Sequence, residues 1–165
     1  LKYLLLAVAS IRKTRDVRLT VIGKPKPGGM IEKLVQELAL GEGVVFTGRI
    51  DEKEFPEYYA KSTIAIVPSI YEGFGLPAGE AMACGVPVIS TTGGALPEVV
   101  GDAGVLVPPG DAQALENAIT ALLDDPDRRH ALAKAGYERV IKNFTWRMCA
   151  INLTEIYREA MHAHG

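Results

Sequence analysis

The sequence predicts an α/β fold in which a doubly wound parallel sheet of about five strands is followed by a helical C-terminal part. Short apolar runs ending at glycine or proline alternate with helical patterns over the first two thirds of the chain. The 165 residues are 48% hydrophobic, which suits one domain with a substantial core. Strands and helices that alternate in this way form parallel sheets covered by helices on both faces.

The alternation begins with a helix over residues 1–13. Its apolar run is too short to cross a bilayer, so we interpret it as a buried helix face. Asp51 and Glu54 have the spacing of a capping box at the start of a later helix. The predicted strands are 17–23, 44–48, 63–68, 86–91 and 104–108, and the predicted helices between them are about 30–40, 51–61, 77–84 and 95–100.

Three helices are predicted after the last strand, over residues 111–124, 127–142 and 146–162. Asp111 and Thr145 are the expected N-caps of the first and third, and Pro126 separates the first two. Phe144 and Trp146 are expected to fasten the last helix to the body of the domain. A doubly wound domain normally opens with a strand, whereas this chain opens on a helix, so we expect a first strand upstream.

Composition argues against several classes of partner. The net charge of −2 comes from interspersed acidic and basic residues, which is unlike a nucleic-acid binder or a membrane-surface protein. No transmembrane segment or export signal is visible in the sequence. Cys84 and Cys149 are expected to be small buried thiols, which fits a reducing cytoplasm. A full-length protein could still contact the membrane peripherally. The three histidines, His130, His162 and His164, are scattered, so no metal site is predicted.

The stretch YEGFGLPAGEAMACGVPVIS, residues 71–90, is expected to carry the binding chemistry. It follows a predicted strand, and ligands of open parallel sheets bind outside the carboxyl ends of the strands. Gly73 and Gly75 would let the backbone approach a ligand, and Pro77 suits the start of a helix. Free N–H groups from Phe74 to Leu76 would then offer a seat for phosphate oxygens at the positive end of the helix dipole.

Two carboxylates flank this turn. Glu80, expected in the first turn of the helix, can accept both hydroxyls of a vicinal diol such as ribose. Glu72, before the turn, can accept from a hexose hydroxyl on the other side of a diphosphate. The alternative is that Glu72 is a solvated loop residue and Glu80 only complements the helix dipole.

Other loops also follow predicted strands. Gly93 and Gly94 either line the same cleft as residues 72–76 or form an ordinary turn at positive φ. The backbone of Arg49 and Ile50 either meets the edge of a nucleobase or belongs to an ordinary connection. Lysines in GKPKPGG, residues 23–29, could touch phosphate, although exposed solubilising side chains are the favoured interpretation.

The ordered motifs resemble one known family. They are VIGK (21–24), VVFTGRI (44–50), VPSIYEGFGLPAGEAMACGVPVIS (67–90), GGALPEVVGDAGVLVPPGD (93–111) and FTW (144–146). In this order they resemble the C-terminal, donor-binding domain of the group 1 (family 4) glycosyltransferases. The resemblance implies a Rossmann-like half of a GT-B fold, in which two such domains enclose a cleft.

The resemblance also implies roles for individual residues. Glu72 matches the glutamate that contacts the donor sugar and is the candidate catalytic residue, and Glu80 matches the glutamate that binds ribose. Gly73 to Leu76 match the turn whose backbone amides contact the sugar and the phosphates. Arg49 and Ile50 match the segment that lies beside the base. The implied donor-binding residues are therefore Glu72, Gly73, Phe74, Gly75, Leu76, Glu80, Arg49 and Ile50, with Gly93 and Gly94 in the second loop.

For the whole family the resemblance implies transfer of a hexosyl group, with retention, from a UDP-, GDP- or ADP-sugar to a glycan, lipid or small molecule. No metal or other cofactor is expected. Residues 1–165 would form the nucleotide-sugar-binding domain without its first strand, its basic phosphate clamp or the N-terminal acceptor domain, so the fragment is expected to be inactive alone. The alternatives are a non-catalytic sugar-nucleotide-binding module and a GT-B epimerase or phosphorylase.

Overall fold

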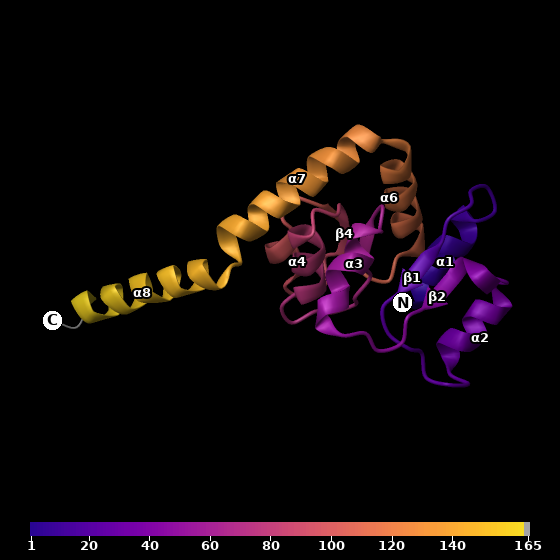
Figure 1. Cartoon of the computed structure of the whole chain (residues 1–165), viewed down its shortest axis with the longest axis horizontal. Helices are drawn as coiled ribbons and strands as arrows, with labels where there is room; N and C mark the ends of the chain where they lie inside the picture. Colours follow the sequence, from indigo (N-terminus) through magenta and orange to yellow (C-terminus); the bar gives the residue numbers. More distant parts are fainter. Residues whose placement is uncertain (164–165) are drawn as a thin grey trace.

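The computed structural model describes residues 1–163 and has the predicted α/β architecture (Figure 1). All strand pairs are parallel, and helices follow the strands in alternation. The strands are β1 Leu19–Val21, β2 Val44–Phe46, β3 Ala65–Val67, β4 Val88–Thr91 and β5 Val105–Val107. The helices are α1 Lys2–Ile11, α2 Met30–Glu37, α3 Phe55–Ala60, α4 Leu76–Ala83, α5 Leu96–Val100, α6 Ala112–Asp124, α7 Pro126–Asn143 and α8 Trp146–Ala163, with short 3₁₀ turns η1 Gly41–Gly43 and η2 Glu52–Glu54.

The five strands are divided between two sheets, whereas the sequence predicted one. Strand β1 pairs with β2, with Thr20 opposite Val45. Strand β4 lies between β3 and β5, with Ile89 opposite both Ile66 and Val105. Within residues 1–163 no strand pairing joins β1 to β3. The alternation of elements therefore predicted the strands and their parallel direction, but not the break between β1 and β3.

Alternate strand residues point into two separate cores, one on each side of the β3–β4–β5 sheet. Val88 belongs to the core formed with α4, α5 and α7, and its neighbour Ile89 belongs to the core formed with α1 and α6. Both side chains are completely buried. Because successive side chains of a strand point to opposite faces, this pattern confirms that helices cover both faces.

Local signals define the helix ends as predicted. The carboxylate of Asp111 accepts the amide of Ala114 at 2.9 Å, and the hydroxyl of Thr145 accepts the amide of Met148 at 3.2 Å. The carboxylate of Glu54 accepts the amide of Asp51 at 2.8 Å, as in a capping box. The segment expected as one helix is divided into η2 and α3.

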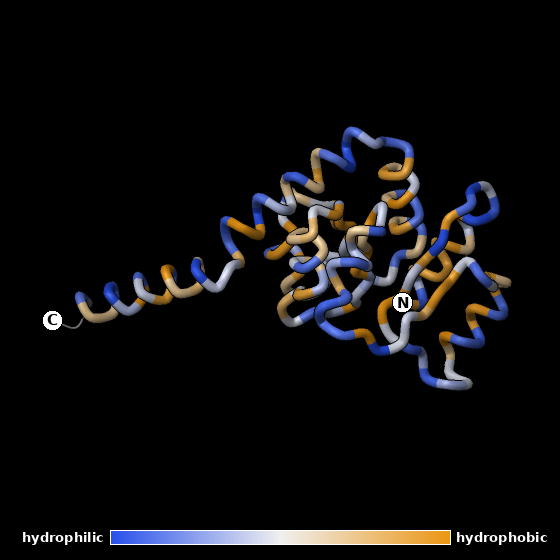
Figure 2. Tube along the Cα trace, viewed as in Figure 1, coloured by the Kyte–Doolittle hydropathy of each residue, from blue (hydrophilic) through white to orange (hydrophobic). Residues whose placement is uncertain are grey.

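The expected anchoring of the last helix is wrong. Helix α8 contacts α7 and then extends away from the rest of the domain (Figure 1). Trp146 is 91% exposed and Phe144 is 39% exposed, so neither fastens α8 to the body. Cys149, on the same helix, is exposed and not buried as expected, whereas Cys84 is half-buried at the end of α4. The sequence prediction failed because a periodic apolar pattern, visible as alternating colours in Figure 2, indicates an apolar face but not what covers it.

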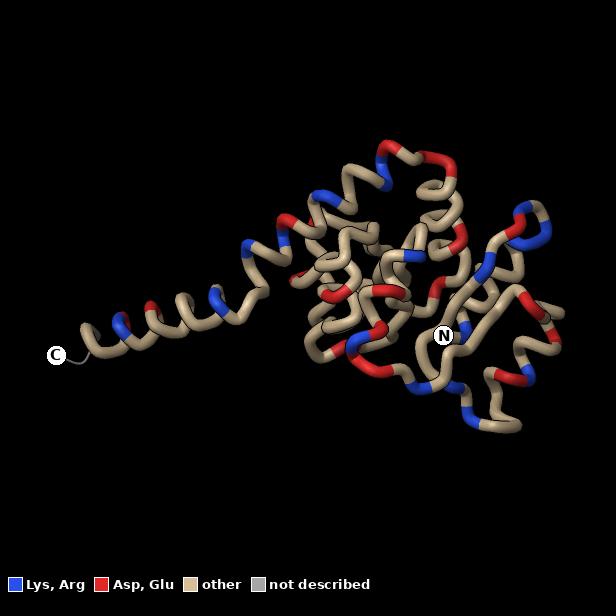
Figure 3. The backbone as a smooth tube through the Cα atoms, in the orientation of Figure 1, with Lys and Arg blue, Asp and Glu red and all other residues tan. Residues whose placement is uncertain are grey.

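Charge is distributed less evenly than the composition suggested. Both signs occur in Figure 3, but lysine and arginine are absent from residues 62–127, where every charged residue is acidic. No helix within residues 1–163 is both long and apolar enough to cross a membrane. His130 and His162 are exposed, and His164 lies outside the described residues.

Candidate functional site

The glycine-punctuated turn leaves the carboxyl end of β3 and enters α4. Gly75 is the N-cap of this helix, with φ of +91°. A side chain there would be strained, and its Cβ would lie 3.2 Å from Leu96 and 3.3 Å from Val99. Gly73, in contrast, faces open space. The sequence argument that glycine permits approach of a ligand therefore holds for Gly73, whereas Gly75 is needed for the turn and for packing.

The backbone amides of this turn are available for a ligand. Among the residues that the structure describes, the amides of Gly73, Phe74, Gly75 and Leu76 make no hydrogen bond. The first amides satisfied in α4 are those of Ala78 and Gly79, which both donate to the carbonyl of Gly75. Unpaired donors together with the positive end of an eight-residue helix favour an anionic group.

The loop that carries Glu72 is held by the loop after β4. The amide of Ala95 donates to the carbonyl of Glu72 at 2.9 Å, and the hydroxyl of Thr91 donates to the carbonyl of Ser69 at 2.5 Å. The hydroxyl of Ser69 donates to Oε2 of Glu72 at 3.3 Å and so orients this half-buried carboxylate.

Gly93 and Gly94 form the other side of this contact. A Cβ on Gly93 would collide with the carbonyl of Ile70, and a Cβ on Gly94 would collide with the carbonyl of Glu72. Gly94 also has φ of +65°. The pair thus supports the loop of Glu72 through close backbone approach, and direct contact of these glycines with a ligand stays a prediction.

Glu80 is oriented by a residue that the sequence did not point to. The hydroxyl of Tyr59 lies 3.4 Å from Oε2 of Glu80 and 3.3 Å from the carbonyl of Pro77. Burial raises the pKa of Tyr59, and the charge of Glu80 and this hydrogen bond raise it further. Burial and the charge of Glu80 also raise the pKa of the Cys84 thiol. Tyr59 thus stays protonated and can donate to Glu80.

The position of Glu80 in its helix differs from the expectation. Helix α4 starts at Leu76, so Glu80 is its fifth residue, and the first turn of α4 contains no acidic residue. The prediction placed Pro77 at the helix start and Glu80 in the first turn. Because side chains of a helix lean towards its N-terminus, Glu80 still projects towards the turn.

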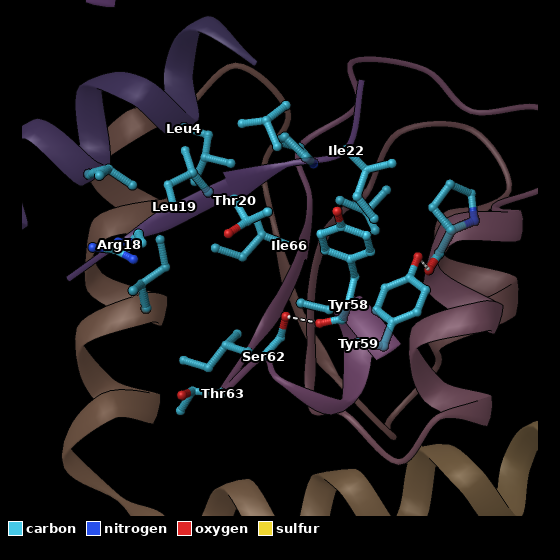
Figure 4. A pocket seen from close by; sticks show the side chains of 18 of the residues that line it. Leu4, Arg18, Leu19, Thr20, Ile22, Tyr58, Tyr59, Ser62, Thr63 and Ile66 are labelled. Carbon is cyan, nitrogen blue, oxygen red and sulfur yellow. Dashed lines mark hydrogen bonds between the residues drawn. The ribbon is translucent and has the colours of Figure 1, made fainter. Parts of the chain in front are cut away.

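A cavity of about 1070 Å³ lies beside this turn and extends between the two sheets (Figure 4). Glu80, Pro77, Ser69 and Ile70 line its end near the turn, and Glu72 does not. The structure therefore brings Glu80 and the orienting residue Ser69 to one cavity that Glu72 does not line, although both glutamates flank the same free amides.

Basic groups are scarce in the loops around the turn, although Arg18 and Lys61 line the cavity. No lysine or arginine occurs between Lys61 and Arg128, a segment that includes β3, β4, β5 and the loops after them. Lys24 and Lys26 are exposed on the loop after β1. Arg49, exposed, and Ile50, half-buried, follow β2 and do not line the cavity. Their predicted place beside a base stays a prediction.

The large apolar side chains of Ile70, Tyr71, Phe74 and Leu76 around the turn are exposed, with Tyr71 78% exposed. The sequence singled out Phe74 and Leu76 for their backbone amides, but it did not predict that these side chains are exposed. Their position in the motif was visible, but apolar residues beside a buried strand normally predict core. Only the tertiary structure shows that these side chains are exposed beside the free amides.

The fold and this turn define a class of protein. A parallel α/β layer with free amides at a helix N-terminus beyond a strand end belongs to the Rossmann-like, ligand-binding class. Comparison with known families then identifies the chain: residues 1–139 match the family model described as "Glycosyl transferases group 1". The chain belongs to this family, and it has the α/β architecture of a GT-B donor domain.

Individual relatives agree with this assignment. The chain is 39% identical over 162 residues to the MMP alpha-(1->4)-mannosyltransferase of Mycolicibacterium hassiacum, covering 96% of this chain and 39% of that protein. It is 40% identical to the solved sucrose-phosphate synthase of Thermosynechococcus elongatus, with a TM-score of 0.82 over 98% of this chain and 43% of that one. The structure of Anabaena Alr3699/HepE in complex with UDP and glucose has a TM-score of 0.79 and 25% identity over 95% of this chain and 44% of that one. The chain thus spans about two fifths of the length of these relatives.

Proposed function

We propose that this chain is the nucleotide-sugar-binding domain of a retaining glycosyltransferase. The donor is a UDP-, GDP- or ADP-sugar, and a hexosyl group passes to a glycan, a lipid or a small molecule. The observation that carries the proposal is the set of free amides at residues 73–76, with one carboxylate before them and one after them. Relatives named as glycosyltransferases and a related structure that contains UDP and glucose support it.

Each part of the site has a role in this proposal. The amides and the dipole of α4 bind the diphosphate, because they are donors directed at a site for negative charge. Glu80, oriented by Tyr59, accepts hydroxyls of the ribose. Glu72, oriented by Ser69, accepts a hydroxyl of the transferred sugar. Arg49 and Ile50 lie beside the base.

Donor binding by residues 1–165 alone is expected to be weak. Free amides supply the only donors in the turn, and a diphosphate also needs basic groups, of which none lies between Lys61 and Arg128. We therefore expect the positive charge to come from a basic clamp on the first strand and loop of this same domain, and the acceptor site to come from an N-terminal domain. We expect negligible sugar transfer by residues 1–165 alone. The reducing cytoplasm is the compartment proposed for the reaction, in accord with the free thiols of Cys84 and Cys149.

The proposal is tested by binding of nucleotide sugars to the purified chain. Saturation-transfer NMR and thermal shift with UDP-, GDP- and ADP-sugars should identify one base that binds. Glu80→Gln should then weaken that affinity about tenfold or more, since it removes a charged acceptor from the ribose hydroxyls. Glu98→Gln, at an exposed acid in the first turn of α5, is the matched control and should leave affinity unchanged.

Three outcomes would contradict parts of the proposal. Equal affinity of wild type and Glu80→Gln would refute the ribose assignment. Absence of a response to every nucleotide sugar at millimolar concentration would refute donor binding by this domain. Sugar transfer by the chain alone at a rate like that of full-length relatives would refute its dependence on a further domain.

A further inference from the structure

Two hydroxyl groups are buried at the carboxyl end of β4. Ser90 and Thr91 are the only buried residues with polar side chains within residues 1–163. Burial of a hydroxyl costs free energy unless the group has a hydrogen-bond partner. The hydroxyl of Ser90 donates to the carbonyl of Val67 at 3.4 Å, whereas that of Thr91 donates to the carbonyl of Ser69 at 2.5 Å. Ser90 therefore bonds within the sheet, and only Thr91 reaches the loop beyond β3.

Both hydrogen-bonding functions of the Thr91 hydroxyl are in use. Its oxygen accepts the amide of Gly93 at 3.3 Å, and its single proton goes to the carbonyl of Ser69. One side chain thus ties the start of the loop after β4 to the loop after β3. A valine at position 91 has the same shape as threonine but can make neither bond.

The bond to Ser69 acts on the orientation of Glu72. The hydroxyl of Ser69 donates to Oε2 of Glu72 at 3.3 Å, so the position of the Ser69 backbone determines where this hydroxyl lies. The amide of Ala95, in the loop after β4, donates to the carbonyl of Glu72 at 2.9 Å. The backbone and the carboxylate of Glu72 are therefore both held, directly or through Ser69, from the end of β4 and the loop after it.

Glu80 is held from a different part of the fold. Its hydrogen-bond partner is the hydroxyl of Tyr59 on α3, at 3.4 Å. In the part of the chain that the structure describes, no hydrogen bond joins the carboxylate of Glu80 to residues 90–95. The two carboxylates that flank the free amides thus have separate supports, one from β4 and one from α3.

We propose that Thr91 is a positioning residue that sets the preference of the site for a nucleotide sugar over the nucleotide alone. This inference rests on the proposed function, in which Glu72 accepts a hydroxyl of the sugar and Glu80 accepts hydroxyls of the ribose. Thr91 is buried, so it acts through Ser69 and Glu72 and not by contact with a ligand. Loss of its hydroxyl releases the carboxylate that binds the sugar and leaves the carboxylate that binds the ribose in place.

Binding of two ligands to Thr91→Val tests the proposal. The ligands are the nucleoside diphosphate and the nucleotide sugar of the same base, each titrated into the chain and followed by NMR. The Kd of the nucleotide sugar should rise roughly threefold to tenfold, and that of the nucleoside diphosphate should change by less than about twofold. Thr91→Ser keeps the hydroxyl and should restore the preference. Ser90→Ala is the matched control, because it removes the neighbouring buried hydroxyl, and it should change neither Kd.

Amide hydrogen exchange tests the support of Glu72 without a ligand. Exchange at the Ala95 amide should become roughly tenfold faster in Thr91→Val, because its acceptor on Glu72 is no longer fixed. The amide of Thr92 donates to the carbonyl of Val107 on β5 at 2.9 Å and is the internal reference. If the wild-type chain binds no nucleotide sugar, the proposed function fails, and exchange at Ala95 still decides whether Thr91 holds the loop.

Three results would overturn the role of Thr91. Equal rises of Kd for the two ligands in Thr91→Val would indicate a general loss of structure and not a sugar-specific effect. Unchanged exchange at Ala95 would show that the hydroxyl does not hold the loop of Glu72. A loss of preference in Thr91→Ser as large as in Thr91→Val would show that the hydroxyl is not the cause. If Thr91→Val does not fold, Thr91→Ala replaces it in both measurements, since alanine removes the hydroxyl without placing a methyl group against the carbonyl of Ser69.

Discussion

The hydroxyl of Tyr59 lies 3.4 Å from Oε2 of Glu80 and links helix α3 to helix α4 over 21 positions of sequence. Tyr59 is buried, and Glu80 is exposed at the end of the cavity near the turn. A buried donor thus holds one oxygen of an exposed carboxylate and leaves the other oxygen for a ligand. Tyr59 is therefore a positioning residue in the proposed ribose site.

Tyr59→Phe should weaken nucleotide-sugar binding without disturbing the fold. Loss of one hydrogen bond of about 0.5–1.5 kcal/mol corresponds to roughly a 2-fold to 10-fold rise in Kd. Isothermal titration calorimetry with the base found to bind measures the effect. Tyr58→Phe is the matched control, because Tyr58 lines the cavity but its hydroxyl makes no hydrogen bond to Glu80. A larger loss with Tyr58→Phe than with Tyr59→Phe would refute the positioning role.

The raised pKa of Tyr59 predicts a specific loss of stability in alkali. Below the ordinary tyrosine pKa of about 10, Tyr59 is protonated in both the folded and the unfolded chain. Above it, Tyr59 ionises in the unfolded chain but stays protonated in the folded one, so the free energy of unfolding falls as pH rises. Urea unfolding at successive pH values should show a smaller fall for Tyr59→Phe than for wild type. Parallel curves for the two proteins would mean that Tyr59 does not titrate differently on folding.

Gly94→Ala should impair both the stability and the site. The substitution places a Cβ against the carbonyl of Glu72 at a residue with φ of +65°, so the loop has to move. Gly28→Ala is the matched control, because Gly28 has the same φ of +65° and open space around it. Backbone strain should lower the free energy of unfolding of each variant by about 1 kcal/mol or more. Gly94→Ala should be destabilised further by its contact with Glu72 and should also bind the donor less tightly. Thermal melts and calorimetry compare the two. Equal losses of stability in the two variants would show that the close approach of Gly94 to Glu72 does not limit the residue at position 94.

Trp146→Ala should leave stability nearly unchanged, although tryptophan is usually among the most costly residues to truncate. Trp146 is 91% exposed at the start of α8, so its removal should change the free energy of unfolding by less than about 0.5 kcal/mol. Leu122→Ala is the comparison, because Leu122 is completely buried in the core formed with α1 and α6. This truncation should lower the free energy of unfolding by about 2–5 kcal/mol. Chemical denaturation measures both. A cost for Trp146→Ala as large as that for Leu122→Ala would mean that α8 packs on the domain in solution.

Local patterns in the sequence determined much of this protein. Five apolar runs predicted the five parallel strands, and Asp111, Thr145 and Pro126 predicted where three helices begin, because caps and prolines act within a few residues. The turn at Gly75 and the carboxylates around it were likewise readable from their order. These features depend on chemistry between neighbours in the chain.

Only the tertiary structure decided the remaining features, because these features depend on which residues far apart in the sequence come into contact. Nothing in the spacing of Tyr59 and Glu80 predicts their contact, and the support of Glu72 by Gly94 comes from a separate loop. The apolar periodicity of α8 was readable, yet its exposure was not, since burial requires a partner surface. The division of the strands into two sheets, with a cavity between β1 and β3, likewise emerged only in three dimensions.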